Sequence, residues 1–179
     1  WAHDTIIVTS YALIASVMKV SGVRNMVFQM QFNKPRETGD YADLAKMLAA
    51  MGMVKKIASS GEFPSLTIRE TRTGIESLSP DLEKAKWQLA RSTLLQMFLN
   101  PHIIHLVSFC EANYAARPED IIESSRIIRR AVRIFIENKS TLLQELENQI
   151  ISKRKEYLES ESEFLLTEIA RLNPKYDEG

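Results

Sequence analysis

The chain has 179 residues, of which 45% are hydrophobic and 26% are charged, with only 6 Gly and 6 Pro. This composition is typical of a globular protein, and the single cysteine excludes an internal disulfide framework. The 23 basic and 23 acidic side chains cancel. The chain as a whole therefore lacks the strong positive field that steers a protein to nucleic acid.

The N-terminal segment has the hydrophobic period of a helix. Ile7, Tyr11 and Ile14 recur at three and four residues, so we expect a helix over about 5–32 with a break allowed near Gly22. The β-branched residues at 6–9 leave a strand open for the first turns.

A second helix is predicted to begin at Asp40, which can cap it, and to reach Met51. Gly52 then separates it from a short apolar turn over 53–57. This order of helix, glycine and short helix looks like a unit of an armadillo or HEAT α-solenoid, although the chain has no fixed internal period.

The segment 62–79 is rich in Pro, Gly, Thr and Ser, which predicts an irregular loop with at most a brief extended stretch at Leu66 and Ile68. Ser79–Pro80 then provides a capping residue and a proline at the first helical position, so we expect a helix to about Leu99. Asn100–Pro101 repeats this signal and predicts a helix over 101–115.

The last helical region is predicted to open at Arg117–Pro118 and to continue to Leu172. Residues 138–140 form either a bend or a polar turn within one long helix. Several apolar residues follow a spacing near the 3.5-residue period of a coiled coil: Leu143, Leu146, Ile150, Tyr157, Phe164 and Leu165.

Together these patterns predict an all-α fold, either a helical bundle or an armadillo- or HEAT-like α-solenoid fragment. We expect a stacked helical domain over 1–137 with the irregular loop at 62–79. A long amphipathic C-terminal helix over 138–173 and a short tail over 174–179 follow.

The sequence offers no residue for catalysis. His102 and His105 have the spacing of two metal ligands on a helix, but Cys110 lies about 140° further around the same helix and no third ligand is indicated. No glycine-rich phosphate loop is present. We therefore predict no catalytic, cofactor-binding or metal-ligating residue and do not expect an enzyme.

The best candidate for a functional surface is a stripe of four arginines at i, i+3, i+4 and i+7 of one predicted helix: Arg126, Arg129, Arg130 and Arg133. Guanidinium groups in such a row can bind carboxylates or phosphates. Three interpretations compete: neutralisation by the acidic C-terminal helix, an acidic protein partner, and nucleic acid. Nucleic acid is disfavoured because no aromatic residues interleave the arginines.

These patterns predict a non-catalytic protein–protein interaction or scaffolding module of a larger assembly. The alternatives are a homo-oligomer that self-associates through the C-terminal helix, and a nucleic-acid-binding protein that uses the basic helix face. The uncharged N-terminal stretch, Thr5–Met18, has 14 residues, which is shorter than the about 20 that span a bilayer, so no membrane span is expected. The single cysteine favours an intracellular location, in the cytoplasm or nucleus.

Overall fold

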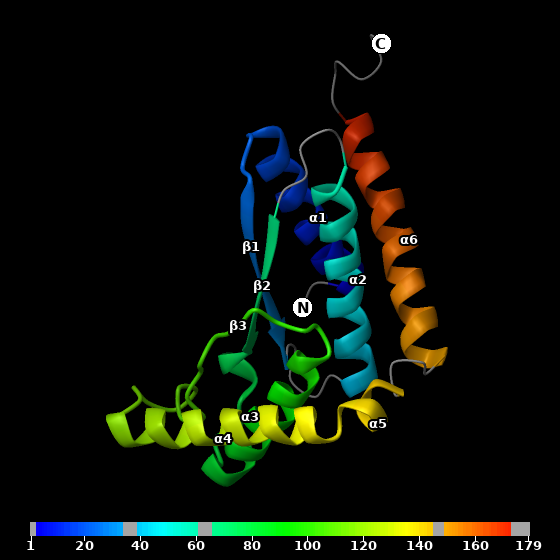
Figure 1. Ribbon diagram of the computed structural model, residues 1–179. Helices are drawn as coiled ribbons and strands as arrows, with labels where there is room; N and C mark the ends of the chain where they lie inside the picture. Colours follow the sequence, from blue (N-terminus) through cyan, green and yellow to red (C-terminus); the bar gives the residue numbers. More distant parts are fainter. Residues whose placement is uncertain (1–2, 34–38, 61–65, 145–148, 173–179) are drawn as a thin grey trace. The chain divides into compact units, whose positions relative to one another are not determined.

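The computed structural model of the protein describes residues 3–33, 39–60, 66–144 and 149–172 (Figure 1). About 67% of the described residues are helical, and the strands form a small three-stranded parallel sheet, so the fold is α/β. The all-α prediction was wrong. In chain order the elements are α1 (Asp4–Val20), β1 (Asn25–Phe32), α2 (Asp40–Ala58), β2 (Leu66–Thr73), the 3-10 helix η1 (Ile75–Ser77), α3 (Leu82–Met97), β3 (Ile103–Ile104), α4 (Pro118–Glu137), α5 (Lys139–Gln144) and α6 (Gln149–Arg171).

Helix α1 ends well before the predicted residue 32. Gly22 has a φ of 75°, a conformation that a residue without a side chain adopts at little cost. The next N–H, of Val23, donates back to the carbonyl of Met18 at 2.9 Å, which closes the helix in the manner of a Schellman motif. The glycine thus terminates the helix rather than interrupting it.

Strand β1 follows directly and has the period of two that a half-buried strand requires. Its buried residues alternate with more accessible ones along the whole strand, and they are Met26, Phe28, Met30 and Phe32. The predicted helix over 25–32 is therefore corrected to a strand. One face of β1 is apolar and packed, and the other is largely exposed.

Two backbone hydrogen bonds join β1 and β2 with the same offset in sequence, one at each end of β2. The N–H of Leu66 donates to the carbonyl of Arg24, and the N–H of Gly74 donates to that of Phe32, both at 2.7 Å. A constant offset means that the two strands run parallel, with α2 as the crossover between them. The irregular loop predicted over 62–79 was therefore wrong for 66–73, where the brief extended stretch that the sequence left open at Leu66 and Ile68 is part of β2.

Strand β3 pairs with the other edge of β2, and Glu70 aligns with Ile103 in a parallel register. The strand order is β1-β2-β3. The helix predicted over 101–115 was wrong, because Asn100 adopts a positive φ of 46° and the N–H of His105 donates to the carbonyl of Thr71 in β2. Pairing with β2, rather than local propensity, determines the conformation here.

Helix α2 passes through Gly52 without interruption. A Cβ at this position would clash with the carboxylate of Glu159 in α6, so the glycine allows a side chain of α6 to approach closely. The likeness to armadillo or HEAT units was therefore wrong, and the described residues contain no helical repeat.

The predicted starts of the two middle helices are confirmed, but the cap of α3 is Asp81 and not the predicted Ser79, and Pro80 precedes the helix. Asp81 accepts hydrogen bonds from the N–H groups of Glu83 and Lys84 at the start of α3, and Pro118 occupies the first position of α4. These residues satisfy or remove backbone donors that a helix start leaves free.

The C-terminal region differs from the predicted long helix. Helix α4 ends at Glu137, and α5 begins at Lys139 after Asn138, so a break occurs at 138–140. The C-terminal helix α6 covers Gln149–Arg171, which is shorter than the predicted 138–173. Residues 145–148 and the predicted tail at 174–179 lie outside the described residues.

The predicted coiled coil was also wrong. Ile150, Tyr157 and Phe164, which carried the heptad spacing, are exposed, whereas Ile151 and Leu158 are buried. The packed face of α6 is thus rotated by one residue relative to the predicted seam.

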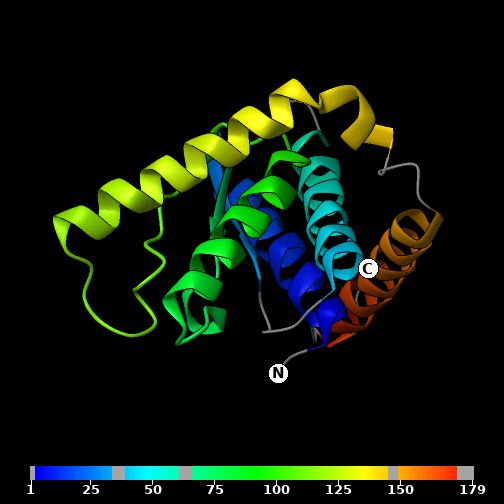
Figure 2. The same cartoon turned by 90° about the horizontal axis from the view of Figure 1, so that it is seen from below.

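The chain divides into two compact units. Unit 1 comprises Trp1–Met26, Ala45–Thr67 and Ser152–Gly179, and unit 2 comprises Val27–Leu44 and Ile68–Ile151. In unit 1, α1, most of α2 and α6 pack together, and ion pairs at 3.0 Å (Arg154–Asp4) and 2.6 Å (Lys56–Glu163) join their surfaces. In unit 2, α3 and α4 lie side by side (Figures 1 and 2).

Candidate functional site

Helix α4 exposes all four arginines of the predicted stripe and buries the opposite side, where Ile128, Ala131 and Phe135 lie. Phe135 meets Phe98 edge to face, with 5.1 Å between the ring centroids. Such aromatic packing fixes the rotation of α4 about its axis. The arginines are consequently held on the outer surface of unit 2.

The stripe does not act as one surface, because α4 separates two hollows. Arg126 and Arg130 line one hollow, and Arg129 and Arg133 line the other. Around the helix axis Arg129 and Arg130 lie at the two sides of the row, about 100° apart, with Arg126 and Arg133 between them. The structure thus divides the predicted site into two pairs.

The first hollow, which we name the α3–α4 groove, has a volume of about 550 Å³ and is lined by residues of α3 and α4 only. Its apolar lining comes from both helices: Ala90 and Leu94 of α3, and Ile127, Ala131 and Ile134 of α4. Trp87 of α3 also lines the groove and is 60% exposed. An exposed indole of this size beside an apolar hollow is unusual for a surface without a partner.

An ion-pair network occupies one end of the groove. Lys86 Nζ lies 2.8 Å from a carboxylate oxygen of Glu83 and 2.8 Å from one of Glu123. The ammonium group also lies 4.9 Å from the ring centroid of Phe109, a favourable cation–π arrangement. Hydrogen bonds to Glu123 and to Glu83, together with the charges of both carboxylates, raise the pKa of Lys86 above its ordinary value of 10.5.

Both carboxylates of the groove, those of Glu83 and Glu123, are thus paired with Lys86. Arg126 and Arg130 consequently have no ion-pair or hydrogen-bond partner among the residues that the structure describes. The groove carries three basic and two acidic side chains, and its lining is therefore positively charged by one. It combines an apolar floor with two guanidinium groups that are available to a ligand.

Trp87 is itself oriented by a neighbouring charge. The guanidinium carbon of Arg91 lies 5.3 Å from the centre of the indole ring, and Arg91 is held by an ion pair with Asp40 at 2.6 Å. This arrangement restrains the indole at the mouth of the groove.

The second hollow, on the Arg129 and Arg133 flank, has a volume of about 480 Å³. The rest of its lining is aliphatic, from β3 and α4: Ile104, Ile128, Val132 and Ile136. It has no aromatic residue and no acidic residue in its lining. The two arginine pairs thus occupy chemically different surroundings.

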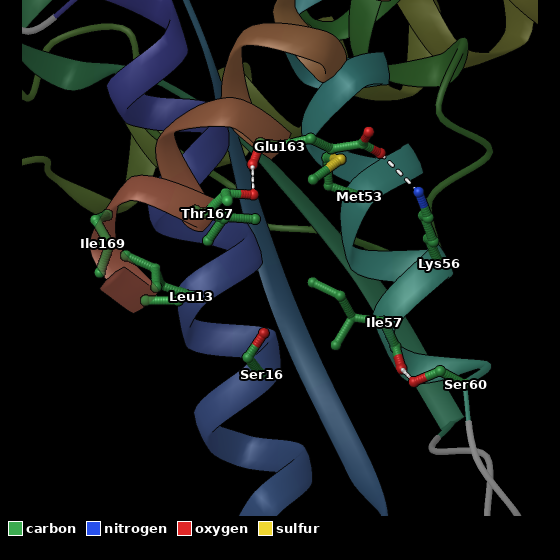
Figure 3. Close-up of a pocket in the computed structure, with 11 residues that line it drawn as sticks. Leu13, Ser16, Met53, Lys56, Ile57, Ser60, Glu163, Thr167 and Ile169 are labelled. Carbon is green, nitrogen blue, oxygen red and sulfur yellow. Dashed lines mark hydrogen bonds and ion pairs between the residues drawn. The ribbon is translucent and has the colours of Figure 1, made fainter. Parts of the chain in front are cut away.

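A third hollow of about 600 Å³ lies within unit 1, between α1, α2 and α6 (Figure 3). Figure 3 shows Leu13 and Ile57 among its apolar lining, and the Lys56–Glu163 ion pair on α2 and α6. The hydrogen bond from Lys56 to Glu163 and the charge of that carboxylate raise the pKa of Lys56. The charged groups drawn in this hollow neutralise each other, so it offers no net charge to a ligand.

The acidic helix α6 was one predicted partner of the arginine stripe. Its carboxylates at Glu159 and Glu163 pair with Lys155 and Lys56, which lie in unit 1 like α6 itself. Glu145 and Glu147, two further acidic residues of the C-terminal region, lie outside the described residues.

The two histidines considered as metal ligands have different partners. His102 Nδ1 accepts a hydrogen bond from the N–H of Arg69 at 3.0 Å, whereas His105 Nδ1 lies 2.9 Å from Glu70 Oε1. Cys110 is buried beside Ser108. The described residues contain no group of three or more His, Cys, Asp or Glu side chains that could hold a metal ion.

Sequence reasoning found the arginines but missed Trp87, Lys86 and Glu123, which complete the groove. Trp87 stands four residues before Arg91 in a strongly helical segment, and nothing in that local pattern indicates that its indole stays exposed. Only the packing of α3 on α4 brings these residues together with Arg126 and Arg130.

The fold and the groove define an α/β protein with a positively charged groove between two helices. The sequence matches no protein-family model and no curated protein. Among the helices that the structure describes, none has the length and apolar character needed to cross a membrane.

Proposed function

We propose that this protein is a non-catalytic protein-interaction module that binds an acidic amphipathic helix of a partner protein in the α3–α4 groove. The observation that carries the proposal is the exposed indole of Trp87 beside an apolar hollow whose α4 wall presents Arg126 and Arg130. Trp and Arg are the residues that most often dominate the binding energy of protein interfaces.

The shape and charge of the groove support a helical ligand. An amphipathic helix binds a hydrophobic groove through apolar residues at i, i+3 or i+4, and i+7, and the hollow between α3 and α4 offers an apolar surface of this kind. Carboxylates on the flanks of the ligand helix would meet Arg126 and Arg130, which make no internal ion pair with the described residues. Complementary charge of this kind selects the partner and fixes its register.

Intrinsic fluorescence offers a direct test, because the chain has only two tryptophans. In a Trp1→Phe background Trp87 is the sole reporter. We expect a designed peptide of about 18 residues, or five helical turns, with leucines on one face and glutamates on the others, to shift the Trp87 emission to the blue. The same peptide with lysines in place of the glutamates should produce no shift.

The two arginine pairs provide matched variants with the same change in charge. Arg126→Glu with Arg130→Glu should weaken the acidic peptide at least about tenfold, a loss of about 1.4 kcal/mol. Arg129→Glu with Arg133→Glu, on the opposite flank, should have a much smaller effect. Equal effects of the two double variants would show that binding depends on overall charge and would refute the groove.

Nucleic acid is the alternative ligand of the arginines, and the same variants separate the two. A phosphate backbone would contact the whole exposed row, so both double variants would elute earlier from a heparin column in a salt gradient. Retention of the native protein at high salt, lost in both variants, would favour this alternative.

Self-association through α6 is a second alternative, and the exposed residues Ile150, Tyr157 and Phe164 favour it. Substitution of Tyr157 and Phe164 by serine would then convert an oligomer to a monomer.

An intracellular location in the cytoplasm or nucleus is part of the main proposal, since the only cysteine is buried and free.

A further inference from the structure

One face of the sheet in unit 2 is not packed. Along β1 the residues that point away from the core are accessible, and Val27 is 50% exposed. At the opposite edge Ile103 of β3 is 46% exposed. Parallel sheets occur almost only where both faces are covered. A parallel-sheet face whose edges stay exposed among the described residues therefore indicates a binding partner.

The centre of this face is a hydrogen-bonded group of polar side chains from β1, β2 and His105, the residue after β3, and the Glu70 side chain within it is 17% exposed. Gln29 Nε2 donates to Glu70 Oε1 at 2.6 Å, and His105 Nδ1 lies 2.9 Å from the same oxygen. Arg72 donates to the side-chain oxygen of Gln29 over a longer distance of 3.4 Å. These bonds hold Glu70 and Arg72 side by side on β2, two residues apart on the same face.

Glu70 and Arg72 make this face complementary to itself. Arg72 has no carboxylate within ion-pair distance among the described residues. A twofold axis that runs across the strands at the level of Thr71 reverses the strand direction. It brings Glu70 of one copy over Arg72 of the second copy, and Arg72 over Glu70. Gln29 then faces Gln31, and Ile103 faces the vicinity of His105.

We propose that the open sheet face is an interface with a second copy of this chain, paired by two symmetric Glu70–Arg72 contacts. An interface with twofold symmetry requires one patch to complement itself, and an acidic and a basic group at adjacent positions meet this requirement when the axis passes between them. The aliphatic side chains of Val27 and Ile103 flank the polar centre and lose their exposed area in the pair.

Sedimentation equilibrium with charge-reversed variants tests the pairing. The native chain should approach twice its mass of 20.5 kDa as its concentration rises. Glu70→Arg alone places Arg against Arg at both contacts, and Arg72→Glu alone places Glu against Glu. Each single variant should therefore raise the dimer dissociation constant at least about tenfold.

Two further samples separate pairing from misfolding. A mixture of the Glu70→Arg and Arg72→Glu chains restores both opposite-charge contacts in the mixed dimer, and the Glu70→Arg, Arg72→Glu double variant restores them within one chain. Both samples should regain the native dissociation constant. Lys84→Glu, which reverses an exposed charge on α3, is the control and should dimerise like the native chain.

A native chain that stays monomeric would overturn the proposal. The exposed sheet face would then be an interface with a different protein. It is equally overturned by a dimer that both single variants form as tightly as the native chain, or by a mixture that fails to restore association. A dimer that is lost on Tyr157→Ser with Phe164→Ser but kept in the Glu70 and Arg72 variants would assign self-association to α6 instead.

Discussion

Truncation should destabilise the fold far more at one residue of β1 than at its neighbour in the chain. Phe28 is 3% exposed and packs in the core, whereas its neighbour Val27 is 50% exposed. Phe28→Ala removes a buried aromatic ring and leaves a cavity, which costs about 3–5 kcal/mol in the free energy of unfolding. Val27→Ala removes two methyl groups that are already half in water, and we expect it to cost less than about 1 kcal/mol.

Urea denaturation at low protein concentration, followed by Trp87 fluorescence in the Trp1→Phe background, measures both changes. At this concentration the open face is free, so the Val27 variant reports the single chain. The indole belongs to α3 in unit 2, the same unit as residues 27 and 28, so it reports the unfolding of the relevant part. Similar losses at the two positions would contradict a strand with one buried face and would reopen the helical interpretation of 25–32.

Three further predictions concern single positions. Lys86→Met keeps the length of the side chain but removes both carboxylate contacts and the cation–π contact with Phe109. We expect it to lower the free energy of unfolding by about 1–2 kcal/mol in thermal or urea denaturation. An unchanged unfolding midpoint would contradict the ion-pair network. The hydrogen bond from Gln29, then that from His105, lowers the pKa of Glu70 below its ordinary 4.5, so its contribution to stability is present above that ordinary pKa and is lost as pH falls through the lower folded value. The unfolding midpoint of Glu70→Gln should therefore depend less on pH than that of the native chain between about pH 5 and 3, and parallel profiles would refute this. Gly52→Ala should be neutral or stabilising by up to about 1 kcal/mol, since only the flexible end of the Glu159 side chain must move. Gly74→Ala should be destabilising, because its Cβ would press on the backbone oxygens of Asn33 and Phe32. The opposite order of the two variants in thermal denaturation would contradict these contacts.

The starts of the two middle helices were predicted correctly from local sequence signals. The capping signals near Pro80 and Pro118 predicted the starts of α3 and α4, although Asp81 and not Ser79 is the cap of α3. Capping satisfies backbone donors within a few residues and needs no distant partner. The four arginines were likewise placed on an exposed helix face. These features depend only on near neighbours in the chain.

The strands could be predicted only in part. The alternation of Met26, Phe28, Met30 and Phe32 is present in the sequence, but it follows an apolar helix so closely that a helical period also fits the segment. Strand β3 has only two residues, and its conformation depends on hydrogen bonds to β2 about 33 positions earlier in the chain. No local pattern can report such a pairing.

The groove could not be predicted from the sequence for the same reason. Its arginines come from α4, while Trp87 and the apolar residues that face them come from α3. Which pair of arginines borders the groove follows from the rotation of α4, and this is fixed by packing contacts such as Phe135 on Phe98.

The central claim is that Arg126 and Arg130 bind acidic groups of a helix that lies in the α3–α4 groove. Reversing the charges on both sides of this contact, in the protein and in the peptide, tests the claim most directly. The variant with Glu at both positions is titrated with the acidic peptide and with the same peptide carrying lysines at the two residues nearest the arginines, with Trp87 emission as the signal. We expect the lysine-substituted peptide to bind this variant at least about tenfold more tightly than the acidic one, in reverse of the native order. If both peptides bind native and variant protein alike, the arginines do not contact the ligand and the proposed function is wrong.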